Sequence, residues 1–92
     1  MNSEARLIIA ILRDAAGEEV LKALLDAEFR VTRIASTGGF MRRGNTTLLI
    51  GVEKERVKTA IQLIRDYSAP AIDPSLKRAT VFVIKVDQFK QI

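Results

Sequence analysis

The feature that most constrains the fold of this chain is a set of short segments in which apolar residues occupy consecutive positions instead of alternate ones. Leu7–Leu12 and Val81–Ile84 are apolar throughout, and so is Leu48–Ile50. Strands with this pattern place apolar side chains on both faces of a sheet. A chain of 92 residues is expected to form a single domain, here 1–92. The sequence therefore predicts one small sheet with two apolar faces.

Helical segments separate the predicted strands in an order that indicates the fold class. Strands are expected at 7–12, 30–37, 45–52 and 78–86. A first helix is expected over 15–28, with Asp14 as its N-cap, and a second from Glu53. The apolar stripes of these helices are predicted to be Val20, Leu21, Leu24 and Leu25, and Val57, Ala60, Ile61, Ile64 and Tyr67. The order β-α-β-β-α-β predicts an α+β, ferredoxin-like domain with a four-stranded antiparallel sheet and two helices on one face.

Two helices can cover only one face of such a sheet, so the opposite face is predicted to be apolar and uncovered. In the last strand Val81 and Val83 alternate with Phe82 and Ile84, so large apolar side chains point both ways. An uncovered apolar face normally marks an interaction surface. We therefore expect a homo-oligomer whose open sheet faces pack together; the alternative is that these side chains are exposed singly.

A second distinctive stretch, residues 36–47, lies between the second and third predicted strands. It contains three of the five glycines of the chain, together with Phe40, Arg42, Arg43 and Asn45. Glycines let backbone N–H groups approach a phosphate, an aromatic ring stacks on a base, and arginines offer positive charge with paired donors. These groups suit a flat anionic ligand, although a loop that only turns the chain is also rich in glycine. The spacing is not that of a P-loop, because Gly44 precedes a predicted strand and not a helix.

Composition excludes several classes of function. The chain has no cysteine and no histidine, which removes disulfides, thiolate chemistry and the commonest general base and transition-metal ligand. No catalytic residue, metal site or cofactor is expected, and the protein is predicted not to be an enzyme. No apolar run approaches the ~20 residues of a membrane span, and a cytoplasmic location is expected. A net charge of +4 fits an anionic partner without choosing among nucleotide, nucleic acid and membrane surface.

Several motifs together resemble the PII-like cyclic-di-AMP receptor proteins, and the similarity runs over most of the chain. The longest motif is Thr-Gly-Gly-Phe-x-Arg-x-Gly-Asn-Thr-Thr at 37–47. The others are Phe29-Arg30-x-Thr32, Gly51, Ala79-Thr80-Val81-Phe82-Val83 and Phe89-x-Gln91. The resemblance implies a bacterial signal-transduction protein that is a homotrimer of ferredoxin-like protomers, with cyclic-di-AMP bound in the clefts between subunits.

The resemblance also implies roles for the matching positions. Phe40 would stack on an adenine, and Arg30 would lie close to the phosphates; the phosphates would be bound by backbone amides of the loop and by Arg30 or Arg42. Phe82 and Gln91 would complete the pocket. Hydrogen bonds to base, ribose or phosphate would come from Thr32, from Asn45 and from the backbone near Gly39, Met41 and Gly51. The full predicted ligand-binding set is Arg30, Thr32, Thr37, Gly38, Gly39, Phe40, Met41, Arg42, Asn45, Thr46, Gly51, Phe82 and Gln91.

The chain departs from the resembled family in one connection. Family members have a long insertion between the second helix and the last strand, where this chain has only Ser68–Lys77. That insertion is thought to help transmit the signal in the family, so its shortening here affects how the signal is passed on. The downstream protein partner of this chain is unknown.

Two other functions are compatible with the same order of elements. An RNA-binding module would place aromatic residues on its third strand, and 45–52 contains none; no nucleic-acid partner is therefore expected. A small-molecule regulatory domain of this topology is the second alternative, and such a domain is usually fused to an enzyme.

Overall fold

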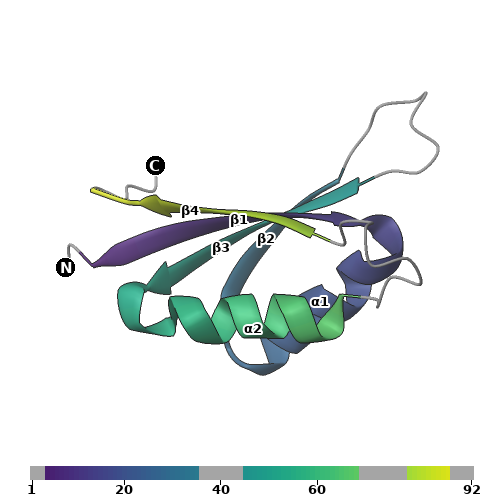
Figure 1. Ribbon diagram of the computed structural model, residues 1–92, viewed down its shortest axis with the longest axis horizontal. Helices are drawn as coiled ribbons and strands as arrows, with labels where there is room; N and C mark the ends of the chain where they lie inside the picture. Colours follow the sequence, from purple (N-terminus) through teal and green to yellow (C-terminus); the bar gives the residue numbers. More distant parts are fainter. Residues whose placement is uncertain (1–3, 36–44, 69–78, 88–92) are drawn as a thin grey trace.

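Four strands form one antiparallel sheet, and two helices lie against one of its faces (Figure 1). The computed structural model describes residues 4–35, 45–68 and 79–87. Its elements, in chain order, are β1 (Ala5–Arg13), α1 (Asp14–Asp26), β2 (Arg30–Ala35), β3 (Asn45–Glu53), the 3-10 turn η1 (Lys54–Arg56), α2 (Val57–Tyr67) and β4 (Ala79–Lys85). The strands lie side by side in the order β2-β3-β1-β4. The predicted ferredoxin-like β-α-β-β-α-β arrangement is therefore confirmed.

Two predicted helix starts are wrong. The strand β1 continues through Arg13, so the helix begins at Asp14 itself, and Arg13 occupies the N-cap position without a side-chain hydrogen bond. The strand β3 likewise continues through Glu53, and η1 intervenes before α2 begins at Val57. At the second helix, the pairing of β3 with β1 extends to Glu53, which local propensity assigns to the helix start, and ladder hydrogen bonds satisfy its backbone groups.

The connection from α1 to β2 is held by a side chain from η1. Glu28 adopts a left-handed backbone conformation, with φ of 68°, and the amide of Phe29 donates a hydrogen bond to the carbonyl oxygen of Leu24, 3.0 Å away. The guanidinium of Arg56 stacks over the Phe29 ring at 4.0 Å from its centroid, a cation–π contact. Its Nη2 also donates to the carbonyl oxygen of Ala27 at 3.3 Å. These contacts fix the point at which β2 begins.

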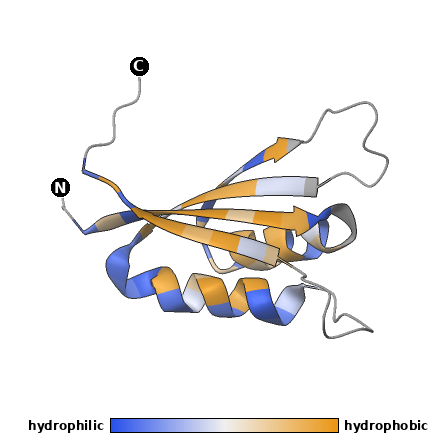
Figure 2. Cartoon of the chain, turned by 45° about the horizontal axis from the view of Figure 1, so that its top comes forward, coloured by the Kyte–Doolittle hydropathy of each residue, from blue (hydrophilic) through white to orange (hydrophobic). Residues whose placement is uncertain are grey.

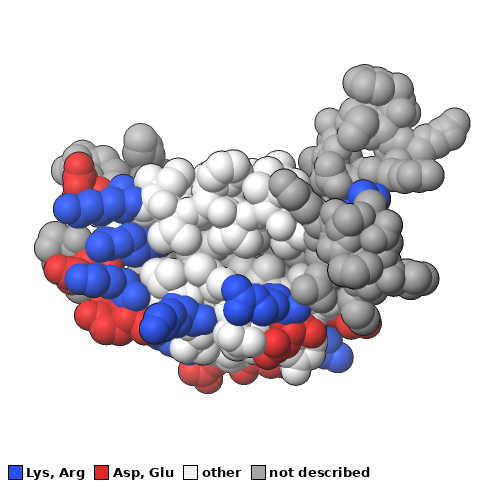
Figure 3. All heavy atoms as spheres, viewed as in Figure 1, with Lys and Arg blue, Asp and Glu red and all other residues white. Residues whose placement is uncertain are grey.

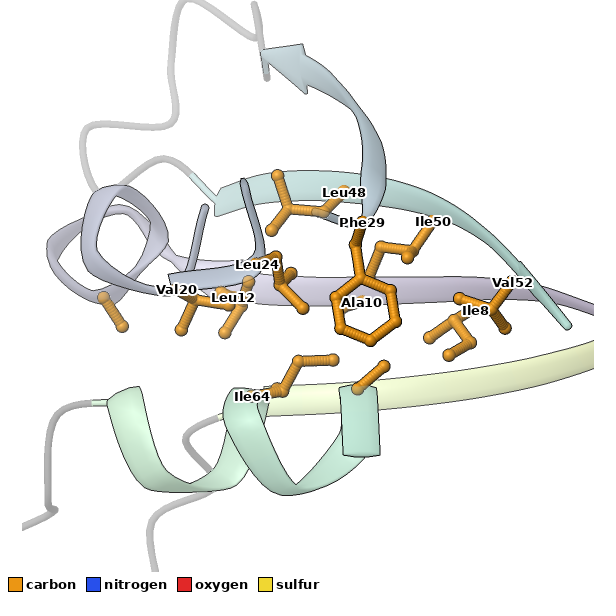
Figure 4. Packing of buried hydrophobic residues seen from close by; sticks show 12 residues of the cluster. Ile8, Ala10, Leu12, Val20, Leu24, Phe29, Leu48, Ile50, Val52 and Ile64 are labelled. Carbon is orange, nitrogen blue, oxygen red and sulfur yellow. The ribbon is translucent and has the colours of Figure 1, made fainter. Parts of the chain in front are cut away.

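The hydrophobic core lies between the helices and the sheet face that they cover (Figure 4). Full burial of one large aliphatic side chain stabilises a fold by about 1.5–3 kcal/mol, and most of these side chains come from the two central strands and from α1. The core residues are Ile8, Ala10, Leu12, Ala16, Val20, Leu24, Phe29, Leu48, Ile50, Val52, Ala60 and Ile64.

Two residues of the predicted apolar stripes are exposed. Leu25 follows Leu24 by one position, a rotation of about 100° around the helix, and its side chain is exposed. Tyr67 is the last residue of α2 and is exposed as well. The other predicted stripe residues are buried or half-buried, so the faces of the two helices were predicted correctly except at their margins.

Charged side chains lie around the helices and at the ends of the strands, while the surface over the middle of the sheet is uncharged (Figure 3). Among the described residues, Arg33 of β2 forms an ion pair with Glu18 of α1, and Lys54 of η1 forms one with Glu4, 3.6 Å apart, just before β1. Exposed pairs of this kind contribute little to stability. Within 4–35, 45–68 and 79–87, no helix has the length and apolar character needed to cross a membrane.

Candidate functional site

The sheet face opposite the helices is lined mostly by apolar side chains, and we call it the open face. The strand register places its residues in three cross-strand rows. The rows, from β2 to β4, are Arg30–Gly51–Leu7–Ile84, Thr32–Leu49–Ile9–Phe82 and Ile34–Thr47–Ile11–Thr80. In Figure 2 the hydrophobic residues, coloured orange, form nearly continuous stretches along the strands. The predicted two-faced character of the sheet is therefore confirmed.

Large apolar side chains on the open face are exposed in a single copy of the chain. The exposed fractions are 48% for Ile34, 52% for Phe82 and 45% for Ile84. All three belong to the two edge strands, β2 and β4, which have a neighbouring strand on one side only. Contiguous exposed apolar surface of this kind is uncommon on monomers and typically marks a contact with a partner or ligand.

Five residues of the predicted ligand set have described side chains or, for glycine, described surroundings. Arg30, Thr32, Gly51 and Phe82 lie on the open face, as the register requires. Thr46 lies on the opposite side of the sheet, where it is buried near α1. The structure thus divides the predicted set between the two faces of the sheet.

Arg30 and Gly51 are directly opposite each other on β2 and β3. A Cβ atom added to Gly51 would meet nothing within 4 Å, and no glycine of the described part of the chain has positive φ. Neither backbone conformation nor packing within the chain therefore requires glycine at this position. Glycine inside a strand often marks a place where a ligand or another chain approaches closely. The residue opposite Gly51 is Arg30, whose positively charged guanidinium is therefore carried by the strand next to this free space.

Thr32 and Phe82 belong to the same row but to opposite edges of the sheet. Two strands separate them, so their backbones are about 14 Å apart at the usual strand spacing. Within one chain these two residues do not line one compact pocket.

The remaining predicted ligand residues lie outside the described residues. Thr37, Gly38, Gly39, Phe40, Met41 and Arg42 fall within 36–44, and Gln91 falls within 88–92. Asn45 begins β3 as predicted, but its side chain is not described. Because 36–44 joins Ala35 to Asn45, the whole stretch is attached at one end of the β2–β3 ladder, beside the Ala35–Thr46 pair.

Reading the sequence alone missed one contact at that end of the ladder. The backbone of Gly17, in the first turn of α1, packs directly against the side chain of Thr46. Nothing in the spacing of the sequence indicates this contact, because it depends on how α1 lies across β3. In the described part of the chain, no group of three or more His, Cys, Asp or Glu residues is placed to hold a metal ion.

The free space beside Gly51 leads to a prediction for Gly51→Ala. The variant should keep its circular dichroism spectrum and unfold at or slightly above the temperature of the parent. The added methyl meets no atom of its own chain, and glycine inside a strand costs about 0.5–1 kcal/mol relative to alanine. A drop of several degrees in the unfolding temperature measured by calorimetry, for a subunit shown to be monomeric, would contradict this description of the site.

Comparison with known proteins finds relatives over nearly the whole chain. The family model for cyclic-di-AMP receptors matches residues 5–70. A functionally unknown protein from Pediococcus pentosaceus, known from its crystal structure, is 33% identical and has a TM-score of 0.78, over 99% of this chain and 100% of that one. Arabidopsis thaliana PII, crystallised with citrate, shares the fold with a TM-score of 0.73 at 24% identity, over 94% of this chain and 80% of that one. This chain therefore belongs to the cyclic-di-AMP receptor family and has a PII-like fold.

Proposed function

We propose that this chain is a non-enzymatic receptor for the second messenger cyclic-di-AMP, and that it works as a homotrimer with its ligand sites between neighbouring copies. The observation that supports the ligand most directly is the match of residues 5–70 to the cyclic-di-AMP receptor family. The role that follows is PII-like signal transduction in the cytoplasm, in which a downstream protein responds to the ligand-bound receptor.

The open face supports assembly of several copies. Its central positions, such as Ile9 and Leu49, are half-buried, and its edge positions are exposed. Burial of apolar surface contributes roughly 25 cal/mol per Å², so covering this face with the same face of other copies would stabilise an assembly. Among the described residues, the other face of the sheet already packs on α1 and α2, so the open face is the one that the sheet can offer to another copy.

The division of the predicted ligand residues between the two sheet edges supports a site shared by two copies. Arg30 and Thr32 belong to β2, and Phe82 belongs to β4 at the opposite edge. In an assembly, the β4 edge of one copy is free to lie beside the β2–β3 end of the next. A single nucleotide would then contact Thr32 from one copy and Phe82 from its neighbour.

The chemistry of the proposed site is binding without catalysis or cofactor. The purine would stack on Phe40, and the phosphates would be held by backbone amides of the glycine-rich stretch and by Arg30 or Arg42. Thr37, Gly38, Gly39, Met41, Asn45 and Gln91 would supply the remaining contacts. Pockets of this kind combine an aromatic or apolar surface with a few placed polar groups.

Titration calorimetry with cyclic-di-AMP, cyclic-di-GMP and ATP tests this function. The parent protein should bind cyclic-di-AMP most tightly, with one ligand per subunit. Stacking on one aromatic ring is worth about 1–3 kcal/mol, so Phe40→Ala should weaken binding by roughly 5- to 150-fold. The matched control, Phe40→Tyr, retains the ring and should bind nearly as well as the parent.

Two results would count against this proposal. A parent protein that does not bind cyclic-di-AMP would remove the function itself. If Phe40→Ala binds as tightly as the parent, the stacking contact is wrong, and the stretch 36–47 is better explained as a turn.

Assembly through the open face can be tested with Ile9→Glu. Ile9 lies in the middle of this face, and burying a carboxylate there without a partner is costly. Sedimentation equilibrium should give the parent three times the 10.2 kDa mass of one chain and the variant a lower mass. Thr59→Glu is the control, since Thr59 is exposed on α2. A parent that sediments as a 10.2 kDa monomer, or a variant with the parent's mass, would disprove this mode of assembly.

A further inference from the structure

The side chain of Arg56 joins the end of one strand to the start of another. Arg56 is the last residue of η1, which follows β3 directly. Its guanidinium lies over the ring of Phe29, 4.0 Å from the ring centroid, and its Nη2 donates a hydrogen bond to the carbonyl oxygen of Ala27, 3.3 Å away. Phe29 immediately precedes β2. One side chain therefore holds together two segments that are 29 residues apart in the sequence.

The segment that Arg56 contacts is the C-terminal end of α1, which has the hydrogen bonds of a Schellman motif. The amide of Glu28 donates to the carbonyl oxygen of Leu25 at 2.9 Å, and the amide of Phe29 donates to that of Leu24 at 3.0 Å. Glu28 has a φ of 68°, at a position that usually holds glycine. A strained conformation of this kind persists where surrounding contacts over-determine it. Arg56 supplies two such contacts, to the residues immediately before and after Glu28.

Both strands joined in this way carry residues of the open face. Arg30 is the first residue of β2, and it pairs with Gly51 near the end of β3. Arg56 thus closes a ring of contacts. The ring runs from Arg30 across the ladder to Gly51, along the chain to η1, and back through Phe29 to Arg30. All of these residues belong to the described part of the chain.

The ring of contacts connects the covered side of the sheet to the open face. Phe29 is buried in the core, whereas Arg30 is exposed and lies on the open face. The two residues are consecutive, so a shift of Phe29 also moves the backbone that carries the Arg30 guanidinium. Arg56 is itself exposed, so its replacement leaves no cavity in the core. Its contact with Phe29 can therefore be removed while the subunit stays folded.

We propose that Arg56 is a positioning residue for the nucleotide site. By stacking on Phe29 it holds the backbone of Arg30 in register with Gly51, so that the Arg30 guanidinium meets a phosphate of the ligand. This inference rests on the proposed receptor function, and on Arg30 as a phosphate ligand within it. Arg56 acts through Phe29 and does not itself touch the nucleotide.

A double-mutant cycle with Arg56→Ala and Arg30→Ala tests the proposal, with the dissociation constant of cyclic-di-AMP measured by titration calorimetry. Arg56→Ala should weaken binding roughly three- to tenfold, within the range of coupling found between residues of one contact network. Arg30→Ala should weaken binding at least as much, because it removes the phosphate ligand itself. The double variant should bind no more weakly than Arg30→Ala, since Arg56 acts only through Arg30.

Arg65→Ala is the matched control for charge. Arg65 is exposed on α2, and its removal lowers the net charge by the same amount as Arg56→Ala. It should leave the dissociation constant unchanged. If it weakens binding as much as Arg56→Ala, loss of general attraction for an anionic ligand explains both effects and the proposal is wrong.

Thermal unfolding and sedimentation of each variant separate positioning from stability and assembly. A residue that serves only stability would change the unfolding temperature but not the dissociation constant of the folded protein. Equal binding by the parent and a folded Arg56→Ala would therefore overturn this inference and leave the receptor function standing. Arg30→Ala that binds like the parent would have the same consequence.

The double variant gives the sharpest result. If its loss of affinity is the product of the two single losses, Arg56 acts independently of Arg30 and the inference is wrong. A parent that does not bind would overturn both the inference and the receptor function. If Arg56→Ala does not fold, Arg56→Met takes its place in the same cycle, because methionine keeps an unbranched apolar stem without the guanidinium.

Discussion

The structure depends on an imbalance between the sheet and the helices that cover it. Both faces of the central strands are apolar, but α1 and α2 lie on one face only. The covered face forms the core of the subunit, and the open face is left with Ile34, Phe82 and Ile84 exposed. A domain of this size buries only about 60–65% of the surface of its unfolded chain, so further burial between copies would add to a small margin of stability. The same imbalance thus connects the stability of the fold to assembly and, through assembly, to the proposed ligand site.

The covered face in turn positions the residues of the proposed site. Arg56 stacks on Phe29 and fixes the start of β2, one residue before Arg30. At the other end of the same ladder, Gly17 packs on Thr46. The strand pair that presents Arg30 and Gly51 is therefore held at both ends by side chains on the helix side of the sheet. In the described part of the chain, α1 and α2 pack on the covered face only, which leaves the open face to a partner or a ligand.

Much of this fold could be predicted from the sequence, because hydrophobic periodicity reports directly on burial. The consecutive apolar residues of β1, β3 and β4 indicated two apolar faces, and both helices were found with their buried sides. The ends of elements were less predictable: Asp14 has the chemistry of an N-cap, but the extension of β1 through Arg13 makes it the first helical residue. The contact of Gly17 with Thr46 was missed because it depends on how α1 lies across β3. Hydrophobic periodicity shows which side of an element is buried, but not which residues of two elements meet. For the site, the residues came from a resemblance in sequence, and the register then showed that Thr32 and Phe82 lie at opposite edges.

The central claim is that one ligand site is built from two copies of the chain, and complementation between variants tests it most directly. Phe40→Ala and Phe82→Ala subunits, with different affinity tags, would be purified separately and also as mixed assemblies selected by both tags. Each pure variant should bind cyclic-di-AMP weakly. The mixed assembly should regain a fraction of sites with the affinity of the parent, because some clefts then join an intact Phe40 with an intact Phe82 from the neighbouring copy. A mixed assembly that binds no better than the two pure variants would contradict the claim.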